Sequence, residues 1–153
     1  LRLLLDVVRL SNQMWLDLPA STVEAVEDSE MLLSSAKLRY AAPYARWRVR
    51  VTLTASGGSL HFKESRNWLK DQHIDVKSPF EGNVLEWIST AVAADMLLRG
   101  HLSFMSNTSG FFKVRVSLMA ERSPNSWQFD HVALAVQQIS VVGVNDAPRI
   151  RGP

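Results

Sequence analysis

Apolar and polar residues alternate along several segments of this 153-residue chain, and this alternation limits the fold more than any other feature of the sequence. In the segment 47–55 the odd positions are apolar and the even positions are polar, and the segment 112–118 shows the same period. A period of two places successive side chains on opposite faces of a β-strand. Weaker patterns predict further strands at residues 3–8, 22–25, 30–34 and 84–88. The chain is therefore expected to consist mainly of β-strands.

Two local features add detail to the strand pattern. The alternation along residues 132–136 changes phase before Ile139 and Val141, which predicts a β-bulge at Gln137–Gln138. The segment 56–59 contains two glycines between two strand patterns, which predicts a hairpin turn joining those strands.

One segment has helical character. Thr90 is placed to cap a helix over residues 91–99, and Gly100 is placed to end it in a left-handed conformation. A helix this short depends on packing against the sheets. Many short strands with turns between them and one helical crossover indicate an all-β sandwich.

The composition excludes several classes of protein. The absence of cysteine rules out a disulfide scaffold, thiol catalysis and cysteine-based zinc sites. A net charge of +2 is too small to indicate nucleic-acid binding, and no apolar run reaches the roughly 18 residues of a membrane-spanning helix. The four histidines stand singly, and no nucleophile or phosphate-binding motif occurs. We therefore predict that the protein is not an enzyme, binds no nucleic acid and does not insert this segment into a membrane.

The C-terminal sequence Val144–Pro148 (VNDAP), which follows a strand pattern, is similar to the junction between tandem cadherin-like repeats of large surface proteins. Three other segments resemble the same family in the family's order, namely its acidic opening at 26–33, its hairpin at 51–60 and its strand, helix and strand at 85–104. The resemblance covers roughly residues 20–148 and implies an immunoglobulin/cadherin-like Greek-key β-sandwich with one short helix.

The same resemblance implies a division of the chain into modules. Residues 1–10 correspond to the last strand of a preceding module and residues 11–19 to a junction. Residues 20–144 correspond to one complete module, and residues 145–153 to a second junction with the start of the next module. The implied partners are neighbouring modules of the same chain, and other copies or other surface proteins in an assembly.

Calcium at the module junctions is a further implication of the resemblance. Glu27 and Asp28 match the acidic head of a module, and Asn145 and Asp146 match the ligands of its foot. Calcium requires several carboxylate and carbonyl oxygens, and the upstream junction has Asn12 without an acidic residue at the matching position. The two pairs are expected at opposite ends of one module and therefore at different sites. The alternative for Asp146 is a turn that its own side chain stabilises.

Five basic residues are placed on one side of two strands that the resemblance makes neighbours. These are Arg46, Arg48 and Arg50 on one strand and Lys113 and Arg115 on the other. Like charges that face each other across a sheet are destabilising, so a continuous basic face would suggest an anionic partner such as an acidic glycan. The alternative is a solvated face with acidic residues between the cations.

Aromatic residues and a glycosylation triplet are the remaining candidates for contact sites. Trp47 and Trp87 lie in phase with apolar neighbours, which favours the core, whereas Trp15, Trp68 and Trp127 are candidates for contact with a sugar. Asn107 begins the triplet Asn-Thr-Ser, a glycosylation acceptor if the protein is secreted by a eukaryote.

These observations lead to one functional hypothesis and one alternative. The hypothesis is a non-catalytic structural or adhesion module of a multi-repeat extracellular or surface-filament protein, acting as a spacer and a protein–protein assembly unit. The alternative is a carbohydrate-binding module of a secreted protein. In either case the expected location is extracellular or at the cell surface.

Overall fold

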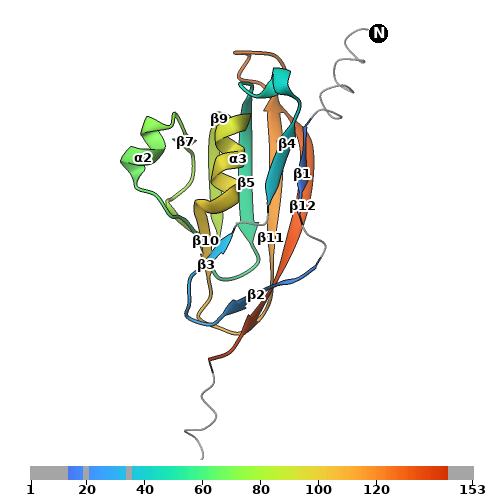
Figure 1. Ribbon diagram of the computed structural model, residues 1–153. Helices are drawn as coiled ribbons and strands as arrows, with labels where there is room; N and C mark the ends of the chain where they lie inside the picture. The colour runs from blue at the N-terminus through green and yellow to red at the C-terminus, as the bar shows by residue number, and fades with distance from the viewer. Residues whose placement is uncertain (1–13, 19–20, 34–35, 145–153) are drawn as a thin grey trace, which may run out of the picture.

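The computed structural model describes residues 14–18, 21–33 and 36–144 of the chain. The strand predicted at residues 3–8 and the junction predicted at residues 145–153 lie outside this part. The described residues fold as a two-layered, all-β sandwich, which confirms the predicted fold class (Figure 1).

The larger layer is a six-stranded sheet. Its strands, in spatial order, are β2 (Val23–Val26), β12 (Phe129–Val142), β11 (Gly110–Glu121), β5 (Arg48–Ala55), β9 (Val84–Thr90) and β7 (Asp75–Val76). Neighbouring strands are antiparallel, except that β2 runs parallel to β12. The two strands with the clearest alternation, β5 and β11, are neighbours near the centre of the sheet, as predicted.

The second layer covers the inner face of the six-stranded sheet with three pieces. The first is a four-stranded sheet in the order β3 (Met31–Leu33), β10 (Leu102–Met105), β6 (Ser59–Phe62) and β8 (Glu81–Gly82). The second is the pair of strands β1 (Met14–Asp17) and β4 (Lys37–Tyr40), and the third is the helix α3 (Ala91–Gly100). Two further short helices lie at the periphery, the 3-10 helix η1 (Ala42–Tyr44) and α2 (Arg66–Asp71) (Figure 1).

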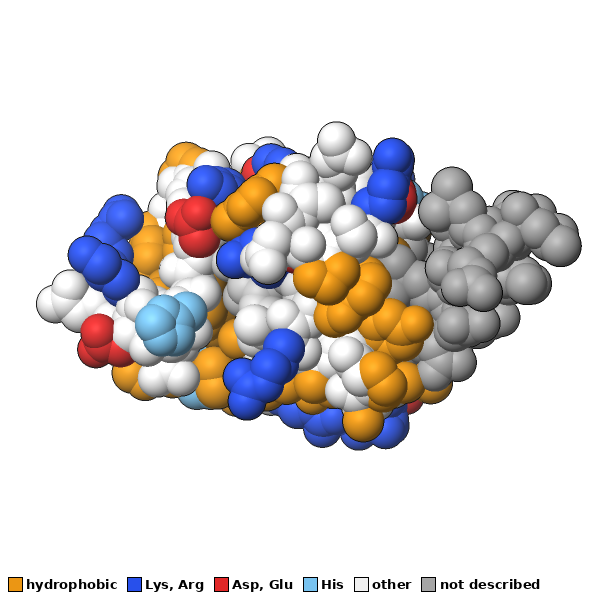
Figure 2. Space-filling view, turned by 90° about the horizontal axis from the view of Figure 1, so that it is seen from above, with side chains coloured by type: hydrophobic (Ala, Val, Ile, Leu, Met, Phe, Trp, Pro, Cys, Tyr) orange, Lys and Arg blue, Asp and Glu red, His pale blue; other side chains and the backbone are white. Residues whose placement is uncertain are grey.

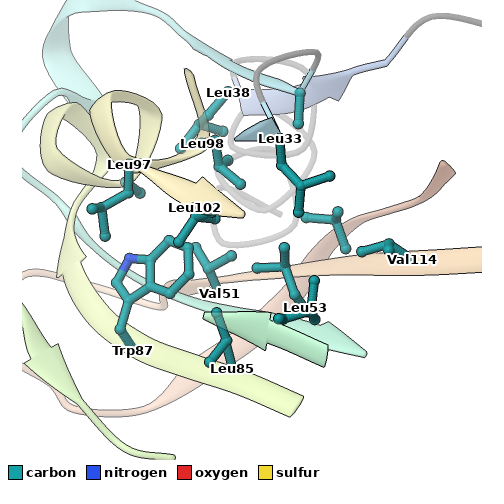
Figure 3. Close-up of a cluster of buried hydrophobic side chains, with 14 of the residues drawn as sticks. Leu33, Leu38, Val51, Leu53, Leu85, Trp87, Leu97, Leu98, Leu102 and Val114 are labelled. Atoms are coloured by element: carbon teal, nitrogen blue, oxygen red, sulfur yellow. The ribbon is translucent and has the colours of Figure 1, made fainter. Parts of the chain in front are cut away.

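Apolar side chains of both layers meet in one core (Figure 3). Six inward-facing side chains of β5 and β11 are at most 2% exposed; they are Val49, Val51, Leu53, Val114, Val116 and Leu118. Trp87 of β9 is fully buried, as predicted, with its ring centroid 5.8 Å from that of Phe62 on β6. Burial of each large apolar side chain contributes about 1.5–3 kcal/mol, so this core is what holds the two layers together.

Helix α3 begins where the sequence predicts and ends slightly later. The Thr90 hydroxyl accepts a hydrogen bond from the backbone N–H of Ala93 at 3.3 Å, which is an N-cap. Gly100 remains inside the helix, since the N–H of His101 still donates to the carbonyl of Leu97. The prediction that Gly100 ends the helix in a left-handed conformation is therefore wrong.

Packing explains why such a short helix is stable. Leu97 and Leu98 are buried and lie among the core side chains near Trp87 (Figure 3). Asp95 accepts a hydrogen bond from the backbone N–H of Leu38 at 2.9 Å, which joins the helix to β4. The helix is thus part of the second layer and not merely a connection.

The glycine-rich segment 56–59 does not form the predicted hairpin. β5 belongs to the six-stranded sheet and β6 to the four-stranded sheet, so the turn between them carries the chain from one layer to the other. Gly58 adopts a left-handed φ of 77°, and a Cβ atom there would lie 2.7 Å from the ring of Phe104. At Gly57 a Cβ atom would lie 2.5 Å from the ring of Phe112. The two glycines are needed because the crossing turn lies directly against core aromatic rings.

The β-bulge predicted at Gln137–Gln138 is also wrong, because both residues pair regularly with β11. Gln137 points inward and is buried, whereas Leu134 and Val136 point outward and are exposed. One polar side chain on the inner face of β12 and two apolar side chains on its outer face make the alternation of the sequence seem to change phase. The register shift of β12 occurs instead at Val132, which is the extra residue between the pairs formed by Leu118 and Met119.

Two other sequence predictions need correction. The interval 11–19, predicted as a junction, includes β1, whose Met14 is completely buried and whose Leu16 packs against the core. The prediction of a single helix missed α2, although Ser65 caps it by accepting a hydrogen bond from the N–H of Trp68 at 3.1 Å. Both elements are too short to show a clear periodicity, so only tertiary packing identifies them.

We expect the substitution Gly58→Ala to destabilise the protein by about 2–3 kcal/mol, because a left-handed φ and a clash with an aromatic ring act together. Urea unfolding followed by circular dichroism measures this loss. The control is Gly100→Ala, whose Cβ would meet no atom within 4 Å and whose helical backbone favours alanine by about 0.5–1 kcal/mol. Equal stabilities of the two variants would contradict the assignment of the turn.

Candidate functional site

The outer face of β11 and β12 combines exposed apolar side chains with cations. We call Phe111, Lys113, Arg115, Leu134 and Val136 the β11–β12 face. Phe111 is 81% exposed and Leu134 is 53% exposed, and Arg115 lies directly opposite Val136 in the strand register. Within the described part of the chain, the Lys113 and Arg115 side chains form no ion pair or hydrogen bond. Exposed apolar groups beside unpaired charges are typical of protein–protein contact surfaces.

The predicted continuous basic face is divided into two groups by the antiparallel register. Arg50 lies opposite Met119 and Arg115 lies opposite Thr54, so the two cations are offset by four positions along the strand direction. That separation is about 13 Å at the usual rise of a β-strand. Arg48 and Arg50 are also half-buried and paired with acidic residues, which the sequence pattern did not indicate.

Arg50 forms the better-defined of these pairs. Its Nε donates to Glu86 of β9 at 2.6 Å, and the Thr52 hydroxyl donates to the same carboxylate at 3.1 Å. The hydrogen bond from Arg50 is the main reason why the pKa of Glu86 lies below its ordinary value of 4.5. The same hydrogen bond raises the pKa of Arg50. This pair therefore neutralises one cation of the predicted basic face.

Arg48 is fixed at the end of the sandwich by three neighbours. Its Nη1 donates to Asn125 Oδ1 at 3.0 Å and lies 3.6 Å from Glu121 Oε2. Its guanidinium carbon lies 4.1 Å from the ring centroid of Trp127, a cation–π contact. Glu121 is only 1% exposed, and a buried carboxylate of this kind requires partners to offset its lost hydration.

The loop between β11 and β12 adopts an unusual backbone at this position. Asn125 and Trp127 both have left-handed φ angles, of 62° and 55°. The N–H of Trp127 donates to Glu121 Oε2 at 3.0 Å, which holds the second of these conformations. At the base of the loop, Arg122 donates two hydrogen bonds to Asp130, at 2.9 and 3.1 Å; they lower the pKa of Asp130. Strained residues held in this way occur often at functional sites.

These groups surround a hollow of about 380 Å³ at the end of the sandwich. Its lining residues come from the segment 43–48 that leads into β5, the N-cap of α3, and the end of β11 with the loop that follows; they are Pro43, Arg46, Trp47, Arg48, Thr90, Glu121, Pro124 and Asn125. We call this the end hollow. Sequence reasoning found Arg46 and Arg48 but missed Glu121 and Asn125.

A serine, a histidine and a glutamate meet on the four-stranded sheet, yet their geometry does not suit catalysis. Ser103 Oγ lies 2.7 Å from His61 Nε2, and Glu30 Oε2 lies 3.1 Å from the same nitrogen. A catalytic triad needs the acid on the opposite ring nitrogen and an accessible hydroxyl, whereas Ser103 is completely buried. Glu30 is also bound by Lys63, which lowers the pKa of Glu30. We interpret the cluster as structural.

Of the candidate calcium residues, the structure describes Glu27 and Asp28. Because β2 runs parallel to the end of β12, Glu27 lies beside Val144, whose N–H donates to Glu27 Oε1 at 3.2 Å. The separation of this acidic head from Asn145 and Asp146 stays a prediction. Asn145 and Asp146 lie outside the described residues. Within the described part, no group of three or more histidine, aspartate or glutamate residues is arranged to hold a metal ion.

The tryptophans proposed for sugar contact do not form one platform. Trp15 is on β1, Trp68 is on α2 and Trp127 is on the β11–β12 loop. The ring of Trp68 stacks on His101 with centroids 4.9 Å apart, and Trp127 packs against Arg48. Asn107 is exposed in the turn between β10 and β11.

Comparisons with known proteins support the fold. No protein-family model matches the chain, and no curated protein matches its sequence. A solved structure of a cohesin module from a family 33 glycoside hydrolase of Clostridium perfringens is similar, with a TM-score of 0.52 and 7% identity over 86% of this chain and 98% of that module. A cohesin in a cohesin–dockerin complex from Clostridium thermocellum matches with a TM-score of 0.49 and 6% identity, over 86% of this chain and all of that one. At such low identity the likeness to the first structure establishes the fold alone. The described helices include none that is long and apolar enough to cross a membrane.

We expect the substitution Glu86→Gln to remove about 1 kcal/mol of stability near neutral pH, because the pair with Arg50 is half-shielded from solvent. The folded-state pKa of Glu86 is lowered, so this stabilisation is present above its ordinary pKa of 4.5 and is lost as the pH falls through the lowered value. On acidification from about pH 7 to about pH 3, the variant should therefore lose less stability than the unsubstituted protein loses, as measured by urea unfolding. An unaltered profile in Glu86→Gln would disprove the role of the pair.

Proposed function

We propose that this domain is a non-catalytic assembly module of a larger extracellular or cell-surface protein. It binds an acidic partner protein through the β11–β12 face. The module also acts as a spacer between its neighbours in the chain.

The β11–β12 face is the observation that carries this proposal. Phe111, Leu134 and Val136 expose apolar surface that would be better buried, and Lys113 and Arg115 lie among them without acidic partners in the described structure. The apolar groups favour a partner with its own apolar side chains. The free cations favour carboxylates at the edge of that partner, since complementary charge directs the encounter.

The fold supports a role in a multi-domain protein. The matched cohesin structure is a module of a glycoside hydrolase, so the same architecture occurs as one unit of a larger enzyme. Buried Ser103 and the shared nitrogen of His61 argue against a catalytic role for the serine–histidine–glutamate cluster of this chain. A carbohydrate-binding function is not favoured, because the candidate tryptophans lie on separate elements.

The path of the chain supports the spacer role. β1 lies beside the upper half of β12, whereas Val144 follows the lower end of β12 (Figure 1). The described chain therefore begins and ends at different ends of the sandwich. Such a unit separates its neighbours by about its own length. The tandem cadherin-like arrangement and calcium at the junction remain predictions within this proposal.

The proposal is tested by photo-cross-linking. We expect p-benzoylphenylalanine in place of Leu134 to form a covalent adduct with one predominant protein in the culture fluid of the source organism, identified by mass spectrometry. The matched control carries the same group in place of Val92, which is 48% exposed on the opposite layer against 53% for Leu134. The same adducts from both positions, or none from Leu134, would count against the proposal.

The identified partner then allows a quantitative test. The double substitution Arg115→Glu and Val136→Glu should weaken its binding by about a hundredfold or more, because it reverses one charge and places another on apolar surface. Isothermal titration calorimetry measures the affinity, and the urea unfolding midpoint verifies that the fold is intact. The double substitution Arg66→Glu and Asn67→Glu is the control, because it makes the same change in net charge at exposed positions of α2, outside the β11–β12 face.

A further inference from the structure

The end hollow has the features of a built ligand site, and it lies apart from the β11–β12 face. Its volume of about 380 Å³ falls within the range of small-ligand and side-chain pockets. Its walls come from three segments far apart in the sequence: residues 43–48 leading into β5, the N-cap of α3, and the end of β11 with the β11–β12 loop. Figure 2 looks onto this end of the sandwich, where basic side chains are more prominent than acidic ones.

The guanidinium of Arg48 is held in one orientation inside the hollow. Arg48 is bound by Asn125 Oδ1 and by the ring of Trp127, and its interaction with Glu121 is a longer contact at 3.6 Å. A guanidinium has five N–H donors, and the structure gives Arg48 one hydrogen bond. Its orientation is therefore fixed, while most of its donors have no acceptor among the described residues. Little conformational entropy is lost when such a side chain binds a ligand.

The charges of the hollow do not balance. Two arginines, Arg46 and Arg48, face one glutamate, Glu121, among the lining residues. Arg46 is exposed at the rim, and the described structure gives its side chain no hydrogen bond or ion pair. One positive charge thus remains without a counter-ion. A single carboxylate would neutralise it, whereas a dianionic phosphate would be repelled by the buried Glu121.

We propose that the end hollow binds the carboxylate of an aspartate or glutamate in a partner peptide segment. Arg46 and Arg48 donate to its two oxygens, and Arg is the residue suited to this paired geometry. Thr90 and Asn125 add polar contacts at the wall. Trp127, which is 57% exposed, provides an apolar surface for the neighbouring peptide residue. This site extends the proposed assembly function to a second contact point, although it does not depend on the β11–β12 face.

The strained loop is explained by this site. The left-handed conformations of Asn125 and Trp127 bring the amide and the indole to Arg48, and Glu121 holds them there through the Trp127 N–H. Such conformations cost about 1–3 kcal/mol each and persist only where other contacts compensate. Two of the compensating contacts, from the Asn125 amide and the Trp127 ring, are made with Arg48 in the hollow.

The test is an NMR titration of the ¹⁵N-labelled protein with a short capped peptide that has one glutamate between glycines. We expect saturable shifts of the resonances of Arg46, Arg48 and Asn125 and of the Trp127 indole. The glutamine analogue of the peptide should cause none. Arg46→Ala should weaken binding about tenfold, the usual effect of removing a hydrogen bond to a charged group. Arg48→Lys keeps the charge but loses the planar donors, and should also weaken it.

Arg66→Ala is the matched control, because it removes an exposed arginine on α2, outside both the hollow and the β11–β12 face. It should change the affinity by no more than about twofold. Equal weakening by Arg66→Ala, binding of the glutamine analogue, or shifts confined to the β11–β12 face would overturn the proposal without affecting the assembly function. A glucuronic acid disaccharide tests the competing class of ligand. If it binds in the hollow more tightly than the peptide, the site belongs to an acidic glycan and the peptide assignment fails.

Discussion

The stability of the fold depends on the burial of the apolar inner face of the six-stranded sheet by the second layer. β5 and β11 present two adjacent rows of apolar side chains, and no single element of the second layer is wide enough to bury both. The four-stranded sheet covers part of these rows, and α3 with the β1–β4 pair covers the rest. The hydrogen bond from the Leu38 N–H to Asp95 joins the last two pieces. This arrangement explains why a helix of ten residues is stable and why Met14 belongs to the domain.

The outer face is then free for interaction, and its charges are arranged by the register of the strands. Arg48 and Arg50 lie near the end where β5 begins and find buried or half-buried carboxylates there. Lys113 and Arg115 lie toward the other end of the sheet, beside exposed apolar side chains of β12. One sequence pattern thus produces two surfaces with different properties, one prearranged by internal ion pairs and one open to a partner.

The fold class could be predicted from sequence because alternation is a local property of each strand. The sequence led to a wrong position for the irregularity in β12, because Gln137 is buried. Its side chain donates to the carbonyl of Ser21, which is distant in sequence. The hairpin prediction failed for a similar reason: glycines permit a tight turn but do not specify which sheet receives the next strand. Within the candidate site, the sequence indicated the arginines. Their partners Glu86 and Glu121 lie on other strands, so only the register brings them together.

The parallel pairing of β2 with β12 has a mechanical consequence. β2 is reached from the end of the sandwich where β1 lies, and β12 leaves at the other end (Figure 1). A force that pulls residues 21 and 144 apart therefore acts along both strands in opposite directions. It loads the hydrogen bonds between them simultaneously in shear, whereas a hairpin pulled at its open end breaks its bonds one after another. In a protein under tension, this short pair of strands would act as a clamp that resists extension of the whole domain.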